Sequence, residues 1–390
     1  MRHVWCISDL HIADKGPRDK FGADCEAALI RLLEDFAAVP SSGRTLICNG
    51  DTFDFLKIDV ALPEPQRGRE RMQRALVAYD SLFTAFREFI AAGNSVFMIV
   101  GNHDLYFDDP RFGQAMVQRI ARSDHGPGFG IVQEFFDPDL RLYIEHGCQF
   151  DTDNDYGENG ALPFGSQMVE DVINKWELRE LDGTKPFFLI DNIRPYNFLA
   201  PYMAALIKRD PALRVFRDEF LEDTAKLMEH SHGSFARRFK GMLLDGMVHL
   251  TKDHPLGDVL IEGFVKYGSK VDYTKYQHAA RAKLAEKSDH YWRPGHGPRH
   301  IIFGHTHYLD EQKLAEDDDG PMYYHNTGTW LENVFLADDG TIALRDRFCP
   351  VLRFEQDGGV VRFDTYDALH RRPIDVPAVL KYYREHHIEI

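Results

Sequence analysis

The sequence predicts an α/β protein whose core is interrupted by a long α-helical insertion. Short apolar runs alternate with amphipathic segments through the first 150 residues, and the middle of the chain is amphipathic and helical throughout. Apolar runs return near residue 298, so the core resumes there. Strands separated by helices favour a largely parallel, buried central sheet.

The individual elements follow from apolar runs and helical periodicity. Strands are expected at residues 4–8, 45–48, 95–100, 131–136, 140–145, 301–303, 323–326, 342–345, 351–355 and 360–366. Helices are expected at 25–36, 72–90 and 112–120, with several more and no good strand in 167–287. Gln356-Asp357-Gly358-Gly359 separates the last two strands and predicts a hairpin. The core therefore comprises residues 1–150 and 298–390, and the insertion comprises residues 151–297.

The composition is ordinary for a globular protein, with 44% hydrophobic and 28% charged residues. No apolar run approaches the roughly 20 residues of a membrane span. The amino-terminal MRHVWCISDLHI lacks the apolar segment of a secretory signal, so we expect a cytoplasmic protein, with peripheral membrane contact left open. The formal net charge of −16 disfavours nonspecific nucleic-acid binding. Cys6 and Cys48 lie in apolar runs and are expected to be buried thiols. The sequence leaves the oligomeric state undetermined.

Five predicted strands are followed directly by polar residues that can bind metal ions. The segments are Ser8-Asp9-Leu10-His11, Gly50-Asp51-Thr52-Phe53-Asp54, Gly101-Asn102-His103-Asp104, His146-Gly147 and Gly304-His305-Thr306-His307. Open α/β sheets place their ligand sites at the carboxyl ends of strands. One such segment alone is weak, because an isolated histidine usually packs in a core. Five together predict a functional site.

The residue types in these segments indicate a dinuclear metal centre. The seven candidate ligands are Asp9, His11, Asp51, Asn102, His146, His305 and His307. Imidazole, carboxylate and carboxamide groups without a thiolate suit Mn, Fe or Zn ions better than a structural zinc site. We expect two divalent ions that share a bridging carboxylate, Mn²⁺ first and Fe or Zn as alternatives. Two ions roughly 3.5–4 Å apart stabilise both oxygens of an in-line phosphoryl displacement and lower the pKa of a bridging water.

The ordered set DLH, GDTFD, GNHD, HG and GHTH resembles the calcineurin-like metallophosphoesterase superfamily. The resemblance covers residues 3–150 and 298–345 and leaves the insertion unmatched. It implies a two-sheet α/β sandwich flanked by helices, and hydrolysis of a phosphoester or pyrophosphate by a metal-bridging hydroxide. It assigns Asp9, His11, Asp51 and His307 to one ion. Asp51, as the bridge, joins Asn102, His146 and His305 at the other ion.

The resemblance also implies roles for residues beside the ligands. His103 is expected near the substrate phosphate, where it protonates the leaving oxygen or stabilises the phosphoryl charge, and is held by Asp104. Packing beneath the site is the alternative for His103. Asn102 and His103 are expected to contact the substrate. For Asp54, a hydrogen bond to a ligand histidine and a helix N-cap are equal alternatives.

Differences between related groups narrow the substrate. Protein Ser/Thr phosphatases carry Arg-Gly after GDxxD and Glu after GNH, whereas this chain has Phe55-Leu56 and Asp104. The motifs, with NTGTW at 326–330, are more similar to UDP-2,3-diacylglucosamine pyrophosphatase-type enzymes, which also carry a helical cap between HG and GHTH. Cys148 departs from their usual Asp, and the insertion is larger. A phosphorylated small molecule or a lipid-linked substrate is expected; a non-catalytic metal-binding scaffold is the alternative.

The insertion is the expected specificity element, since it leaves the core after His146 and returns before His305. Residues 192–199 either line a substrate pocket or form helix–helix core, and the second is favoured. Arg237, Arg238, Arg293 and Arg299 either clamp a phosphate or lie on solvated faces. The acidic run at 151–155 lacks the glycine and glutamate of a calcium loop.

Overall fold

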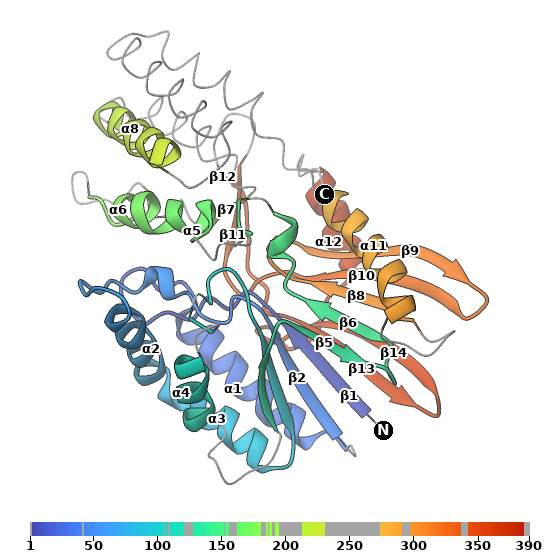
Figure 1. Cartoon of the computed structure of the whole chain (residues 1–390). Helices are drawn as coiled ribbons and strands as arrows, with labels where there is room; N and C mark the ends of the chain where they lie inside the picture. Colours follow the sequence, from blue (N-terminus) through green and yellow to red (C-terminus); the bar gives the residue numbers. More distant parts are fainter. Residues whose placement is uncertain are drawn as a thin grey trace. The chain divides into compact units, whose positions relative to one another are not determined.

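The computed structural model of the chain forms two compact units (Figure 1). It describes residues 2–40, 43–104, 106–107, 110–120, 128–151, 153–155, 162–180, 185, 187–188, 192–194, 213–230, 274–290, 297–336 and 342–385. The first unit comprises Met1–Asp151, Tyr273–Leu331 and Arg347–Ile390. The second comprises Thr152–Asp272 and Glu332–Asp346. The expected α/β class is confirmed.

The larger sheet of the first unit has seven strands in the order β15-β14-β13-β1-β2-β3-β4 (Figure 1). Their bounds are β1 Arg2–Ile7, β2 Gly43–Asn49, β3 Ser95–Ile99, β4 Phe129–Val132, β13 Pro350–Asp357, β14 Val360–Asp367 and β15 Arg372–Pro373. Strands β1 to β4 run parallel, whereas β13 pairs antiparallel with β1 and, as the predicted hairpin, with β14. The sheet is mixed rather than largely parallel, because the C-terminal hairpin returns to the edge of β1.

The smaller sheet has five strands in the order β5-β6-β8-β10-β9. Their bounds are β5 Glu134–Asp137, β6 Leu142–Glu145, β8 His300–Phe303, β9 Leu309–Asp317 and β10 Gly320–Thr327. Strands β6, β8 and β10 are parallel neighbours, and β5 and β9 pair antiparallel at the edges. The single strand expected at 131–136 is two strands, since β4 belongs to the larger sheet and β5 to the smaller.

The two sheets of the first unit pack face to face and carry helices on their outer faces. Alternation along β1 shows the layering: Val4 and Cys6 pack among residues of the smaller sheet, whereas Trp5 and Ile7 pack against helices. The helices are α1 (Gly22–Ala38), α2 (Gln66–Ala78), α3 (Asp80–Ala91), α4 (Pro110–Ile120), α11 (Thr274–His290) and α12 (Val376–Glu385). The sandwich flanked by helices that the resemblance implied is confirmed.

The described part of the second unit combines helices with a three-stranded sheet. Among the described residues its elements are α5 (Phe164–Met168), the π-helical turn η3 (Val169–Ile173), α6 (Asn174–Trp176), α8 (Arg214–His230), β7 (Ile193–Arg194), β11 (Asn333–Leu336) and β12 (Ile342–Asp346). Trp176 is fully buried against Phe187 and Phe220. Strand β7 was not expected, because its two residues become a strand only by pairing with the distant β11. Among the described residues no helix is long and apolar enough to cross a membrane.

A buried histidine pair between the two sheets predicts acid sensitivity. His300 Nδ1 lies 3.0 Å from His325 Nε2, and both rings pack against Phe354 and Phe363. Burial, reinforced by Arg141 and Arg299, lowers the pKa of His300 from 6.5 to about 3, and burial also lowers the pKa of His325. The unfolded chain therefore binds protons that the folded protein does not.

The stability supplied by neutral His300 is complete above pH 6.5 and falls as the pH drops towards 3. The loss through His300 is expected to reach about 5 kcal/mol at the acid end of this window. Urea unfolding measured across the window, with a chelator present, tests this for the wild type and His300→Phe. The variant should lose less stability on acidification; equal losses in the two proteins would contradict the assignment.

Candidate metal centre

The five polar segments follow strand ends, as the sequence predicted. Asp9 and His11 follow β1, Asp51 follows β2, and residues 102–104 follow β3 of the larger sheet. His146 follows β6, and residues 305–307 follow β8 of the smaller sheet. Backbone hydrogen bonds join the segments: His11 N–H donates to Asp51 O, and Gly304 N–H donates to His146 O. The sandwich therefore brings both groups of segments to one edge.

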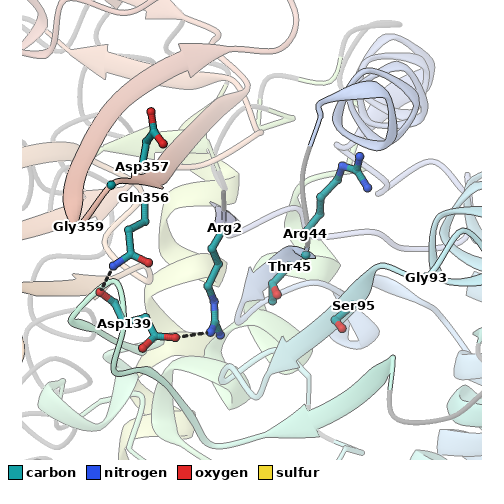
Figure 2. A pocket seen from close by; sticks show the side chains of 11 residues that line it. Arg2, Arg44, Thr45, Gly93, Ser95, Asp139, Gln356, Asp357 and Gly359 are labelled. Carbon is teal, nitrogen blue, oxygen red and sulfur yellow. Dashed lines mark hydrogen bonds and ion pairs between the residues drawn. The ribbon is translucent and has the colours of Figure 1, made fainter.

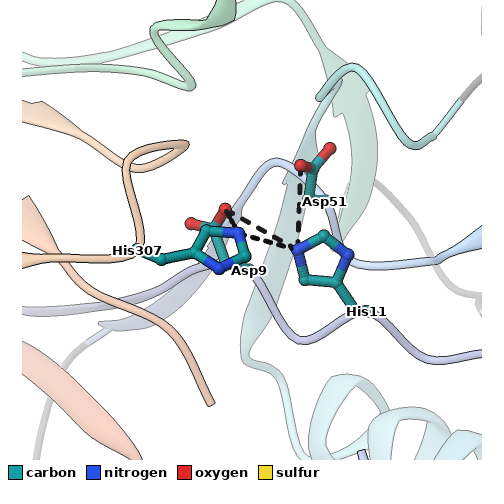
Figure 3. Close-up of side chains that lie close together, drawn as sticks. All are labelled: Asp9, His11, Asp51 and His307. Atoms are coloured by element: carbon teal, nitrogen blue, oxygen red, sulfur yellow. Dashed lines mark hydrogen bonds and ion pairs between the residues drawn. The ribbon is translucent and has the colours of Figure 1, made fainter. Parts of the chain in front are cut away.

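Asp9, His11, Asp51 and His307 form the first group of side chains that could hold a metal ion (Figure 3). One ligand atom from each lies within 4.8 Å of the others, and all four residues are buried. His307 Nε2 lies 3.2 Å from Asp9 Oδ1 and 3.0 Å from His11 Nε2. His11 Nε2 lies 3.9 Å from Asp51 Oδ2. Two imidazoles and two carboxylates thus converge on one point.

Asp51, His146 and His305 form a second such group, so Asp51 belongs to both. His146 Nε2 lies 3.3 Å from Asp51 Oδ2, and His146 Nδ1 lies 2.9 Å from the carbonyl oxygen of Asn49. A hydrogen bond donated by Nδ1 to that carbonyl leaves the lone pair on Nε2, the atom that faces Asp51. Asn102 is also buried, and the backbone N–H of the following His103 donates to Asp51 Oδ1.

The backbone at these positions is unusual. Positive φ angles of 46° to 66° occur at Asp9, His11, Asp51, His305 and His307. Three further non-glycine residues of the described chain share this conformation. The left-handed region costs an L-residue about 1–2 kcal/mol and persists only where surrounding structure imposes it. Clustering of strained residues is typical of functional sites, so these five support a site at this edge independently of residue type.

Glycines provide the space that the cluster needs. Gly50 has φ +78°, and a Cβ placed on it would lie 2.2 Å from His146 Nδ1. A Cβ placed on Gly101 would lie 2.2 Å from Asp51 Oδ1. Side chains at either position would collide with the two groups, which accounts for the glycines beside the candidate ligands.

His103 reaches the same edge, but Asp104 does not hold its ring, contrary to the expectation. His103 Nδ1 lies 2.9 Å from Asp54 Oδ1. The Asp104 carboxylate instead accepts hydrogen bonds from the backbone N–H groups of Thr52, Phe53 and Gly101. Adjacency in sequence was misleading here, because the turn after β3 directs Asp104 beneath the Asp51 loop.

Asp54 occupies the position between His11 and His103. Its Oδ2 lies 3.3 Å from His11 Nδ1, while Oδ1 contacts His103. Asp54 precedes the short helix η1 (Phe55–Lys57), but its side chain makes no capping hydrogen bond there. Of the two readings left open by the sequence, the histidine contact is the one present.

The electrostatics keep the Asp51 and Asp54 carboxylates ionised, whereas burial raises the pKa of Asp104 to about 8. Burial alone raises the pKa of Asp51, but the imidazoles of His146, His103 and His11 outweigh it and hold the pKa well below its usual range. Burial alone would also raise the pKa of Asp54. His103 and His11 outweigh this effect, and the pKa of Asp54 is lowered. Burial lowers the pKa of His146, yet the Asp51 charge raises it to about 9. When the imidazoles lose their protons, a metal cation can take the place of those protons and be attracted by the same carboxylates.

The residues present fit divalent cations. Two atoms at the edge, Asp9 Oδ1 and His146 Nε2, are buried and make no hydrogen bond within the described structure. Buried polar atoms are seldom left unsatisfied, and an ion bound between the candidate ligands would satisfy these two. Imidazole nitrogens and carboxylate oxygens without a thiolate suit ions such as Mn, Fe or Zn.

Sequence reasoning missed further residues at this edge. Asp151 Oδ2 lies 3.3 Å from His305 Nε2, and Lys275 Nζ of α11 lies 3.5 Å from Asp151 Oδ1. Thr329 Oγ1 and the backbone N–H of Trp330 both donate to the carbonyl oxygen of Asp9. The HGCQFD run placed Asp151 five residues after His146, and that spacing was its only signal.

Of the four arginines that the sequence offered as a phosphate clamp, only Arg299 is among the described residues. Arg299 is buried and donates to Gly320 O and to Asp317, so it serves the turn before β10 rather than a phosphate. Arg237, Arg238 and Arg293 lie outside the described residues, as do residues 195–199. A cavity of about 580 Å³, lined by Arg2, Arg44 and Ser95 among others, opens at the amino ends of β1, β2 and β3. Figure 2 shows this cavity, which is at the opposite end of those strands from the candidate ligands.

Comparisons with known proteins agree with this geometry. Residues 2–309 match the family model described as calcineurin-like phosphoesterase. No curated protein matches the chain. The family match spans all five ligand-bearing segments and well over half of the sequence. The chain therefore belongs to the calcineurin-like phosphoesterase family and is a phosphoesterase.

Proposed function

We propose that the chain hydrolyses a phosphoester or pyrophosphate bond with two divalent metal ions held at this edge. The observation that carries the proposal is the Asp51 carboxylate, which belongs to both ligand groups. A shared carboxylate is the expected link between two ions a few ångströms apart. The first ion would be held by Asp9, His11, Asp51 and His307, and the second by Asp51, Asn102, His146 and His305. We propose Mn²⁺ as the ion, ahead of Fe or Zn.

When bound, the two ions would supply Lewis acidity and a nucleophile from water near neutral pH. The protein's own groups do the remaining work. Asp54 holds the His103 ring through Nδ1, which directs Nε2 away from that carboxylate. The backbone N–H of His103 donates to Asp51 and fixes the start of the turn. We propose that His103 protonates the leaving oxygen, and that Asn102 and His103 contact the substrate phosphate.

His103→Ala is expected to lower kcat by about 10²–10⁴-fold for an ester with a basic alkoxide leaving group, since general acid catalysis contributes on that scale. A p-nitrophenolate leaving group needs little protonation, so its loss should be much smaller. Steady-state kinetics on p-nitrophenyl and alkyl phosphoesters measures the difference, and Asp54→Asn should show the same leaving-group dependence in weaker form. Equal losses for both esters would show that His103 is not the acid.

Metal-dependent hydrolysis itself is tested with p-nitrophenyl phosphate and bis-p-nitrophenyl phosphate. The chelated protein should be inactive, and Mn²⁺, Fe²⁺ or Zn²⁺ should restore turnover. If metal binds but no ester is cleaved under any of these ions, the alternative of a metal-binding scaffold is favoured instead.

For the substrate we propose a lipid-linked nucleoside diphosphate of the UDP-2,3-diacylglucosamine type. The motif pattern and the position of the second unit's main segment between HG and GHTH support this choice. We further propose that residues 151–297 provide specificity and allow peripheral membrane contact. Incubation with UDP-2,3-diacylglucosamine in detergent micelles should yield UMP and a lipid phosphate. Cleavage of monoesters alone would exclude this substrate class while leaving the metal mechanism intact.

A further inference from the structure

Two buried thiols from distant parts of the chain meet in the first unit. Cys25 on α1 and Cys349, directly before β13, place their sulfur atoms 3.6 Å apart. Both residues are fully buried. Cys6 and Cys48 also lie on neighbouring strands, but they face opposite sides of the sheet, since Cys6 packs between the sheets and Cys48 packs towards the helices. The Cys25–Cys349 contact is thus distinct from ordinary thiol burial.

The surroundings of Cys25 favour a reactive sulfur. Arg347 Nη2 lies 3.3 Å from Cys25 Sγ and also donates to Asp24, and its side chain is 32% exposed. The hydrogen bond with Cys349 lowers the pKa of Cys25, burial opposes this, and the Arg347 charge adds to the lowering. By contrast, burial raises the pKa of Cys6 and of Cys48. A thiol beside a guanidinium is the more nucleophilic one, because the thiolate is the reacting form.

We propose that Cys25 and Cys349 are a thiol oxidation site that closes to a disulfide in the presence of hydrogen peroxide and reopens with a thiol reductant. A disulfide needs the sulfurs at about 2.05 Å. From 3.6 Å, closure requires side-chain rotation together with shifts of α1 and of the residues before β13.

The reaction balances in two steps. The Cys25 thiolate attacks one oxygen of hydrogen peroxide, the O–O bond breaks, and Cys25 becomes a sulfenic acid as hydroxide leaves. The Cys349 thiol then attacks the Cys25 sulfur; the S–O bond breaks, and water departs with the thiol proton. Two thiols and one peroxide give one disulfide and two water molecules. A dithiol reductant reverses the step by exchange.

The site lies where the chain leaves and re-enters the first unit. Residues 332–346 belong to the second unit, so Leu331 and Arg347 are the two ends of that excursion. Cys25 Sγ donates to the carbonyl oxygen of Trp330, which directly precedes Leu331. It also contacts Arg347 at the other end of the excursion. Trp330 also donates its backbone N–H to Asp9 O and its indole N–H to Pro350 O. Oxidation would therefore replace the hydrogen bond from Cys25 to Trp330 with a covalent bond from Cys25 to Cys349, two residues after Arg347.

Peptide mapping of the peroxide-treated full chain tests the proposal. After treatment, free thiols are blocked with N-ethylmaleimide under denaturing conditions and the protein is digested without reduction. A cross-linked pair containing Cys25 and Cys349, two hydrogens lighter than the two free peptides, is expected, and dithiothreitol should remove it. Recovery of both residues as blocked thiols, while the partly exposed Cys148 is oxidised, would overturn the proposal.

Thermal unfolding provides a second readout. Oxidised wild type should melt several degrees above the reduced protein, because the cross-link restricts the unfolded chain over a long loop. Cys148→Ser, the matched control, should keep this reversible shift, whereas Cys349→Ser should lose it. A shift that persists in Cys349→Ser would assign the effect to another residue and refute the pair. If Cys349→Ser fails to fold, the mapping of the wild type still decides.

Discussion

Asp51→Asn is expected to abolish the binding of both metal ions and to lower phosphoesterase activity by about 10³-fold or more, since the ions supply several kcal/mol of transition-state stabilisation. The carboxylate is the one group shared by the two clusters. An amide keeps its size but removes the charge that His146, His103 and His11 surround. The backbone N–H of His103 would also lose an ionised acceptor.

Metal content per chain, measured by mass spectrometry of the elements after dialysis, is the direct readout for this variant. Asp364→Asn is the matched control. It is the same substitution, but at an exposed strand residue that pairs with Arg353. The control should retain full metal content and activity. If Asp51→Asn retained one ion at full occupancy, the bridging role would be wrong; if it retained activity, Asp51 would not belong to the centre at all.

Gly50→Ala is expected to have the second-largest effect, because it combines a collision with backbone strain. The new methyl group would lie 2.2 Å from His146 Nδ1, and the residue would have to keep φ near +78°. The two effects together should lower the free energy of unfolding by about 2–5 kcal/mol. His146 must also move, so the second ion should be bound far more weakly than the first.

Gly93→Ala separates strain from collision. Gly93 has φ +85°, similar to Gly50, but nothing lies within 4 Å of a Cβ placed on it. It should lose only about 1–2 kcal/mol, with unchanged metal content. Urea unfolding in the presence of a chelator, followed by metal titration, compares the two. An equal loss of unfolding free energy in both variants would mean that His146 can move away from a methyl group at position 50 without cost.

The sequence predicted most of the buried elements, because apolar periodicity reports burial. Some of the elements it missed have partial burial or depend on distant pairing, whereas β11 and α12 were missed although their apolar residues are buried. Strand β9 is an edge strand whose run LDEQKLAED exposes much of its polar surface, so no apolar alternation marks it. Helices α2 and α3 were expected as one, since the apolar periodicity continues across the break at Tyr79. Nothing local signals that Gln133 separates strands of different sheets.

The positions of the candidate ligands after strand ends agree with the prediction, because strand ends can be read from local sequence. The contacts between segments could not be read in this way. Asp104 was paired with His103 because they are adjacent, yet Asp54, from the turn after another strand, contacts that ring. Asp151 was considered only as part of an acidic run, because its partner His305 is 154 residues away. Contacts of this kind are set by the packing of one sheet on the other.

The left-handed backbone at five candidate ligands has a consequence for how this protein can change over time. A glycine at any of those positions would relieve the backbone strain, but it would delete a metal-binding atom. At these five residues, relief of backbone strain therefore favours glycine, whereas metal binding requires aspartate or histidine. Stabilising substitutions that accumulate freely elsewhere are blocked here, so the rest of the sandwich must compensate. A descendant that lost its metals would be expected to drift towards glycine at these turns first.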